Sequence, residues 1–131
     1  MTAKQFLSRG RWIEREITSL IRTRDETRDR LTHITQNYDS DGAQTTKDPH
    51  KFDSLVELEY KIDELIDRLY ATKTEILGVI DKLEDRREFL ALKVYYIDMK
   101  TWEEVCVEMN YSWKQIMRIR KRAIANVEAL L

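Results

Sequence analysis

The chain has 131 residues, of which 42% are hydrophobic and 36% charged, and its formal net charge is −1. The apolar content is enough for a modest core and argues against wholesale disorder, while the near-neutral charge argues against a protein that coats nucleic acid over its whole surface. Only three glycines and one proline occur, which favours long helices over many short elements.

Several kinds of chemistry have no support in the sequence. The single cysteine, Cys106, cannot form an internal disulfide, and no spacing of Cys and His suits zinc. His33 and His50 lack partners at metal-ligand spacings, and no nucleophile lies at a recognisable distance from a base. No apolar run approaches a membrane span, and the N-terminus lacks the apolar region of a signal peptide. We therefore expect a cytoplasmic protein without cofactor, metal, membrane contact or enzymatic activity.

Residues 4–37 carry a heptad pattern that predicts a first long helix. Its predicted core positions follow each other at spacings of four and three residues: Ile13, Ile17, Leu20, Arg24, Thr27, Leu31, Ile34 and Tyr38. Trp12 and Ile21 widen the apolar stripe, as expected for a helix that packs against more than one neighbour. The dense charges of residues 22–30 are expected to form its solvated face.

Residues 38–50 are polar and contain the only proline, which predicts a loop. Asp48 and Pro49 suit the N-cap and the first position of the next helix. Residues 49–83 repeat the heptad spacing, with core positions at Leu55, Leu58, Ile62, Ile66, Leu69, Lys73, Ile76, Ile80 and Leu83. Two such helices joined by one loop predict a long antiparallel, coiled-coil-like hairpin over residues 1–83.

The stripe of this second helix is broader than one partner helix requires. Four further apolar residues lie beside its core positions: Val56, Tyr60, Tyr70 and Leu77. We therefore expect the hairpin to pair two chains in a homodimer. The alternative is that the C-terminal part of the same chain covers the surplus apolar surface.

Residues 84–131 predict a second domain, a three-helix module. Its helices are expected over residues 85–98, 101–109 and 112–130. Asp85 suits the N-cap of the first, and Glu88 is placed to complete a capping box. The module is close to the minimum length for an independent fold, so we expect it to lean on the long helices. The predicted fold is all-α, a helical hairpin followed by a helix-turn-helix module.

Within this module, residues 99–125 read as two short helices joined by a tight turn. Thr101 can cap the first helix, with Glu104 completing a capping box. Asn110 stands where the chain needs a residue that tolerates a left-handed conformation. Ser112 is the expected N-cap of the second helix.

The helix over residues 112–130 is predicted to bury one face and expose a basic one. Ile116, Ile119, Ala123 and Val127 form the apolar face, and residues 114–122 contain five basic residues and no acidic one. A basic helix after such a turn is typical of a recognition helix in the DNA major groove. A merely solvated helix face is the alternative.

The position of each polar residue on this helix predicts its contact with DNA. Base-edge contacts are expected from Lys114, Gln115 and Arg118, because Arg and Lys suit guanine and Gln suits adenine. Phosphate contacts are expected from Thr101, Ser112, Trp113, Arg120, Lys121 and Arg122. For Trp113, packing on the turn is the alternative, and for Trp102 local packing and support of a phosphate contact both stay open.

Leu83–Leu131 resembles the region of bacterial sigma factors that reads the −35 promoter element. Thr101–Cys106 matches its Ser-Tyr-Glu-Glu-Ile-Ala helix, and Met109–Ser112 matches its Leu-Gly-Ile-Ser turn. Ile116 and Arg122-Ala123 match the Val and Arg-Ala of its recognition helix. With the heptad-rich helices upstream and a polar loop between them, nearly the whole chain is similar to the phage ArpU/RinA-type late transcriptional regulators.

This resemblance implies a sequence-specific regulator of phage or prophage late or packaging genes, acting in a bacterial host cell. Double-stranded DNA is the implied partner, and bacterial RNA polymerase a second one. Two other interpretations stay open. The chain fits a DNA-recognition subunit of a phage packaging (terminase) complex. It also fits a coiled-coil interaction protein whose helix-turn-helix has lost DNA binding.

Overall fold

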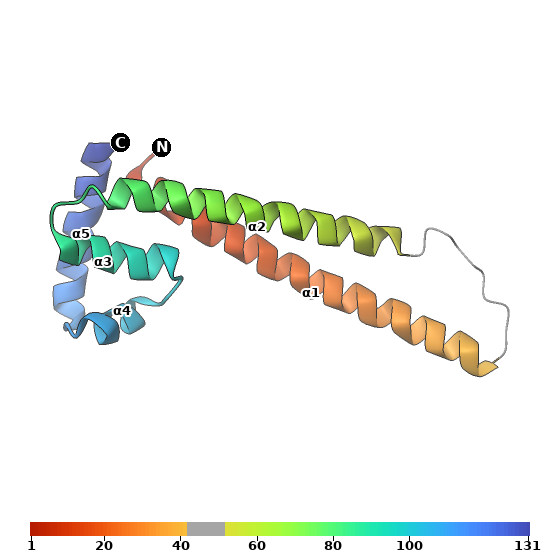
Figure 1. The fold of residues 1–131 in the computed structure, drawn as a ribbon. Helices are drawn as coiled ribbons and strands as arrows, with labels where there is room; N and C mark the ends of the chain where they lie inside the picture. The colour runs from red at the N-terminus through yellow and green to blue at the C-terminus, as the bar shows by residue number, and fades with distance from the viewer. Residues whose placement is uncertain (42–51) are drawn as a thin grey trace. The chain divides into compact units, whose positions relative to one another are not determined.

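The computed structural model describes the backbone of residues 1–41 and 52–131, with side chains for residues 1–33 and 52–131. Every regular element in these residues is helical, which confirms the all-α class (Figure 1). The elements are, in order, α1 (Ala3–Asp41), α2 (Asp53–Ile80), α3 (Arg86–Leu92), the π-helix η1 (Lys93–Ile97), α4 (Trp102–Met109) and α5 (Trp113–Leu130).

The two long helices are the predicted pair, with different ends. α1 continues to Asp41, beyond the predicted end at residue 37, because no glycine or proline occurs between Gly10 and Gly42 to stop it. The rest of the predicted loop, including the expected cap at Asp48 and Pro49, lies outside the described residues. α2 ends at Ile80, three residues before its predicted end.

The element predicted as one α-helix over residues 85–98 consists of α3 and the π-helix η1. The N–H of Asp98 donates to the carbonyl oxygen of Lys93 at 3.0 Å, five residues earlier, which is the π-helical pattern. The extra residue in this turn rotates the side chains that follow. Within η1, Tyr96 is buried beside Tyr95, and their ring centroids are 4.7 Å apart.

The N-cap of α3 is confirmed, but its predicted capping box is wrong. Asp85 Oδ1 accepts a hydrogen bond from the Arg87 N–H at 2.9 Å. Glu88 does not reach back to the cap. Its side chain is 2% exposed, and its Oε2 accepts a hydrogen bond from Asn126 Nδ2 of α5 at 2.8 Å. A partner distant in the sequence therefore outweighs the local pattern.

Contacts divide the chain into two compact units, which we describe separately. The first unit consists of Met1–Ile13 and Leu69–Leu131, and the second of Glu14–Arg68. The C-terminal helices therefore share a unit with the first turns of α1 and the last turns of α2. This unit crosses the domain boundary expected between residues 83 and 84.

The core of the first unit explains why it crosses that boundary. Phe6 and Leu7 of α1 and Ile76 and Ile80 of α2 belong to the same buried cluster as the C-terminal helices. From those helices the cluster includes Ala91, Leu92, Val94, Tyr96, Trp102, Val105, Ile116, Ile119, Ala123 and Val127. Burying one large aliphatic side chain contributes about 1.5–3 kcal/mol, so the long helices supply a substantial part of this core.

In the second unit, antiparallel stretches of α1 and α2 follow the predicted heptads. Ile17 and Ile62 are buried at predicted core positions, whereas at the next position Leu65 is buried and its predicted neighbour Ile66 is half-buried. Arg28 and Glu59 form an ion pair at 2.8 Å between the two helices. Of the four residues that broaden the stripe, Val56 and Tyr60 of this unit are exposed, and so are Tyr70 and Leu77 of the first unit. The homodimer stays a prediction.

Candidate nucleic-acid interface

The turn between α4 and α5 has the conformation that the sequence predicts. Asn110 has φ 57° and ψ 45°, in the left-handed region that asparagine tolerates. α4 begins after Thr101, whose Oγ1 accepts a hydrogen bond from the Glu104 N–H at 3.2 Å. Only this half of the predicted capping box forms, because Glu104 Oε1 accepts from the Thr101 hydroxyl at 3.4 Å instead of from its N–H.

A complete capping box begins α5. Ser112 Oγ accepts a hydrogen bond from the Gln115 N–H at 3.2 Å, and Gln115 Oε1 accepts one from the Ser112 N–H at 2.9 Å. The Ser112 cap is confirmed, and its partner is the residue expected to read adenine. A bidentate adenine contact needs both the oxygen and the NH₂ group of glutamine. The base contact predicted for Gln115 therefore shares the side-chain oxygen with the Ser112 N–H, which uses one of its two lone pairs.

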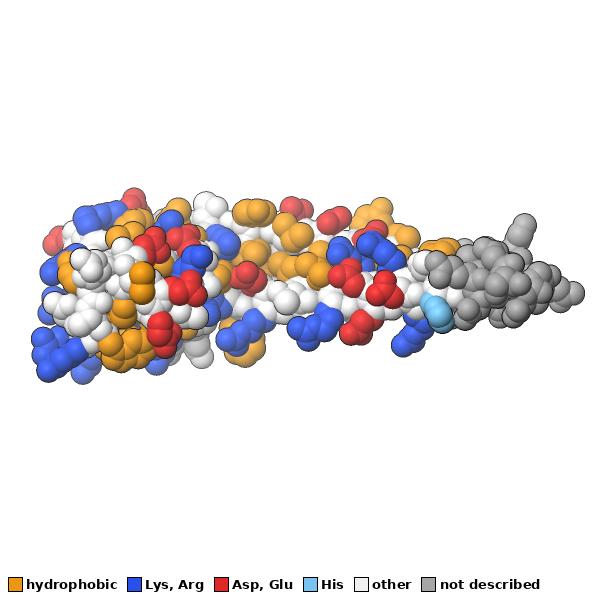
Figure 2. Space-filling view, turned by 90° about the horizontal axis from the view of Figure 1, so that it is seen from below, with side chains coloured by type: hydrophobic (Ala, Val, Ile, Leu, Met, Phe, Trp, Pro, Cys, Tyr) orange, Lys and Arg blue, Asp and Glu red, His pale blue; other side chains and the backbone are white. Residues whose placement is uncertain are grey.

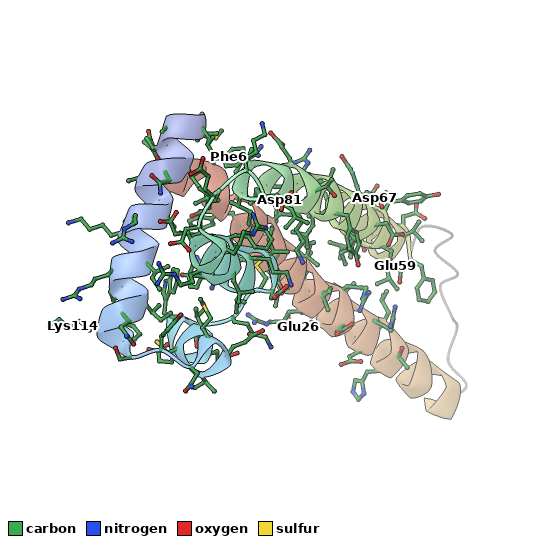
Figure 3. The ribbon with its side chains drawn as sticks, turned by 60° about the vertical axis from the view of Figure 1, so that its left-hand side comes forward. Phe6, Glu26, Glu59, Asp67, Asp81 and Lys114 are labelled. Atoms are coloured by element: carbon green, nitrogen blue, oxygen red, sulfur yellow. The ribbon has the colours of Figure 1, made fainter. Side chains whose placement is uncertain are left out.

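The rest of α5 separates a buried face from a basic one. Ile116, Ile119, Ala123 and Val127 are buried, as predicted. The opposite face exposes Lys114, Arg118, Lys121 and Arg122. Figure 3 shows Lys114 pointing away from the helix, and in Figure 2 Lys and Arg side chains gather at the left-hand edge, where Figure 1 places α5.

These cations are available to an external anion. None of the four forms an ion pair with a carboxylate in the described part of the chain, in contrast to Arg86, Arg87 and Lys93 of the preceding helices. Lys114, Arg118 and Lys121 are spaced by four and three residues, so they share one face of the helix. They span about 10 Å along its axis, and the major groove is about 12 Å wide.

Trp102, whose role the sequence leaves open, lies in contact with Arg120, a predicted phosphate contact. The Trp102 ring stacks on the Tyr95 ring with centroids 4.1 Å apart and planes inclined by 13°. The guanidinium carbon of Arg120 lies 5.0 Å from the Trp102 centroid, and that of Arg11 lies 4.1 Å from the Tyr95 centroid. We call Arg11, Tyr95, Trp102 and Arg120 the cation–π stack. Such contacts contribute about 0.5–2 kcal/mol each.

This stack positions the basic helix within the first unit. It joins α1, η1, α4 and α5, and Arg11 also donates a hydrogen bond to the Tyr95 carbonyl oxygen at 2.7 Å. Trp102 is only 8% exposed, so it packs locally and is not available to DNA. Arg120 is half-buried against it, and the predicted phosphate contact of Arg120 would compete with the stack.

The remaining predicted contacts lie at the ends of helices. Trp113, the first residue of α5, is 50% exposed, which leaves its ring available at the surface beside the turn. Thr101 and Ser112 are exposed at the N-termini of α4 and α5, where the helix dipole favours anions. The sequence did not predict the part that Arg11 and Tyr95 have in the cation–π stack. Neither residue lies in the helix-turn-helix, and no local pattern connects α1 with η1.

Three pKa values are shifted in this unit, and the Asp85 carboxylate, as the hydrogen-bond partner of Arg87, raises the pKa of that guanidinium. The Arg87 side chain, hydrogen-bonded to Asp85, holds the pKa of the Asp85 carboxyl below its usual value. Burial raises the pKa of the Tyr96 hydroxyl above its usual value. Over the residues that the structure describes, no group of three or more His, Cys, Asp and Glu side chains could hold a metal ion.

The fold and this surface define an all-helical protein with a helix-turn-helix that presents a basic helix. The chain belongs to the family described as Protein of unknown function (DUF1492), whose model matches residues 35–128. The match includes all of α2 to η1, the turn and most of α5. Neither the curated proteins nor the solved structures contain a significant match. Of the described helices, none is long and apolar enough to cross a membrane.

Proposed function

We propose that this protein is a sequence-specific DNA-binding transcriptional regulator that places α5 in the major groove. The observation that carries the proposal is the exposed face of α5, where Lys114, Arg118, Lys121 and Arg122 have no carboxylate partner in the described residues. The helix follows a left-handed turn at Asn110, as in helix-turn-helix proteins. The resemblance of Leu83–Leu131 to the −35-reading region of sigma factors supports the same function.

Each cation has a proposed role that follows from its place along α5. Lys114 and Arg118 lie in the first half of the helix, the part of a recognition helix that meets base edges, and both suit guanine. Lys121 and Arg122 lie about one turn beyond Arg118, where the helix leaves the groove and meets phosphates. Because the chain is near neutral overall, DNA affinity depends on these few charges and falls with salt.

Selection of bound sequences from random DNA at defined salt tests this function. We expect one recurring motif. Arg118→Ala is expected to weaken binding to that motif by about 1–3 kcal/mol and to relax the preference at one base pair. Lys82→Ala, which removes an exposed lysine after α2, is the matched control and is expected to leave the motif unchanged. Recovery of no motif by the wild-type chain would overturn the proposal.

Two partners beyond DNA are part of this proposal. The broad apolar stripe of α2 supports a second copy of the chain, paired through the helical hairpin, and the sigma-like resemblance supports bacterial RNA polymerase. A dimer predicts two half-sites about 10 base pairs apart, or a multiple of that. The mass of the protein in solution checks the assembly. A closed ring of many subunits would contradict the regulator and would favour a DNA-recognition subunit of a packaging complex.

A further inference from the structure

A second basic feature borders the exposed face of α5. A groove of about 290 Å³ is lined by Lys4 of α1 and by Met117, Arg120, Lys121 and Ile124 of α5. Three of these five residues are cationic and none is acidic. Met117 and Ile124 are half-buried and give the groove an apolar floor. We call it the Lys4 groove.

The start of α1 is held firmly beside α5. The N–H of Ala3 donates a hydrogen bond to Glu128 Oε2 of α5. Ala3, Phe6 and Leu7 are buried in the core that also contains Ala123 and Val127. Phe6 lies near α5 in Figure 3, and the two chain ends lie close together in Figure 1. Lys4 is therefore placed by packed neighbours on both sides of it in the sequence.

The charges of the groove favour an anionic occupant. Lys4 and Lys121 are exposed, and neither forms an ion pair in the described residues. Arg120 forms the inner wall, where its guanidinium contacts Trp102. Glu128, a carboxylate of α5, already accepts a hydrogen bond from the N–H of Ala3, the residue before Lys4. Two cations thus remain available to one external anion.

The position of Lys121 indicates which anion this is. Lys121 lines the groove and also lies on the exposed face that carries Lys114 and Arg118. It is seven residues beyond Lys114, which is about 10 Å along the helix. At that distance, a helix in the major groove of DNA reaches the phosphate backbone that borders the groove. A DNA strand that contacts this face therefore passes the groove, whereas an acidic peptide has no such continuity with the face.

We propose that Lys4 is a DNA phosphate contact, which acts with Lys121 to hold the strand that borders the major groove. The inference rests on the proposed function and adds a contact from the other end of the chain. The Lys4 ammonium group neutralises a phosphate and displaces its condensed counterion. Such a contact adds affinity without base preference.

Salt titrations of DNA binding by the full-length chain test this contact. The slope of log affinity against log salt concentration is expected to become shallower by about 0.9 in Lys4→Ala, because one phosphate contact is lost. Affinity is expected to fall by the same factor for the selected motif and for random DNA. Lys4→Arg is expected to keep the wild-type slope, and Lys82→Ala is the control for removing one exposed lysine.

The outcomes separate this inference from the proposed function. Absence of a DNA motif for the wild-type chain would overturn the function itself. Specific binding by the wild type together with an unchanged slope in Lys4→Ala would overturn only the contact. Lys4→Gln is measured in parallel, and thermal unfolding of both variants confirms that they are folded. Lys4-dependent binding of polyglutamate, with the DNA slope unchanged, would assign the groove to an acidic protein segment and also overturn the contact.

Discussion

Asn110 shows how much of the turn depends on one residue. Its φ of 57° lies where most L-residues cost about 1–2 kcal/mol, because Cβ approaches the following carbonyl oxygen. Its own N–H and that of Tyr111 donate to carbonyl oxygens at the end of α4 at 3.2 and 3.1 Å. These bonds end α4 and direct the chain into α5.

Substitution at this position tests the conformation directly. Asn110→Ala is expected to lower the free energy of unfolding by about 1 kcal/mol. Asn110→Gly, which has no Cβ, is expected to change it by no more than a few tenths. Urea unfolding followed by circular dichroism measures both. Equal stability of the two variants would contradict a left-handed residue at this turn.

Tyr96 predicts how stability depends on pH at the alkaline end. Burial raises the pKa of its hydroxyl in the folded chain, so the unfolded chain loses this proton first as pH rises. The unfolded state then binds fewer protons than the folded state, and stability falls with rising pH. The stabilisation by the buried, un-ionised hydroxyl is complete below the tyrosine pKa of the unfolded chain, about 10. It is lost as pH rises through the raised pKa of the folded chain.

Tyr96→Phe is expected to remove this dependence while keeping most of the packing. Thermal unfolding is measured from about pH 8 to about pH 11, a range that includes the ordinary tyrosine pKa of about 10. The loss of stability at the alkaline end should be smaller in Tyr96→Phe than in wild type. Tyr60→Phe, which changes an exposed tyrosine, is the matched control, and identical curves for the two variants would contradict the prediction.

Among the helices, α5 begins with a side chain, that of Gln115, which has both a structural role and a predicted role in DNA binding. Gln115 completes the capping box with Ser112, and the same amide is predicted to read adenine. A substitution can separate the capping role of this side chain from its adenine contact. A glutamate at this position caps the helix equally well, because its carboxylate accepts the same N–H. It cannot donate to adenine N7, and it adds a negative charge beside DNA.

Gln115→Glu is therefore expected to keep stability while weakening DNA binding. Gln115→Ala is expected to lower the free energy of unfolding by about 0.5–1 kcal/mol, because the box is lost. Thermal unfolding measures the first effect, and titration of the selected DNA motif measures the second. Undiminished DNA affinity in Gln115→Glu would mean that this residue acts only as a cap.

At the scale of the whole molecule, the first unit draws its core from both ends of the chain. Leu7 is fully buried among residues of the C-terminal helices. A fragment of residues 84–131 lacks five large core side chains: Phe6, Leu7, Ile76, Ile80 and Leu83. We expect this fragment to be unfolded. Circular dichroism and the dispersion of its amide proton chemical shifts in NMR spectra check this expectation.

Leu7→Ala in the full chain tests the same point without truncation. The free energy of unfolding is expected to fall by about 2–5 kcal/mol, as for other leucines removed from a core. Val107→Ala removes a residue that is 82% exposed on α4 and is expected to change stability by less than about 0.5 kcal/mol. A folded 84–131 fragment would contradict the dependence of the module on α1.

The local features of this protein could be predicted from the order of its residues. Heptad spacing predicted the long helices, because burial of one helix face imposes a period on the residues of that helix. The caps at Thr101 and Ser112 and the turn at Asn110 were equally predictable, because each depends on bonds within a few residues. The basic face of α5 follows from the same helical periodicity.

Contacts between distant residues could not be predicted in this way, because they depend on the packing of the folded chain. Glu88 fits a local capping pattern, yet it pairs with Asn126 of α5. Arg11 joins the cation–π stack, and Lys4 lines the groove beside α5, although both come from the start of the chain. A contact across about a hundred residues leaves no periodic trace in the sequence, because it depends on how complete helices pack around a shared core.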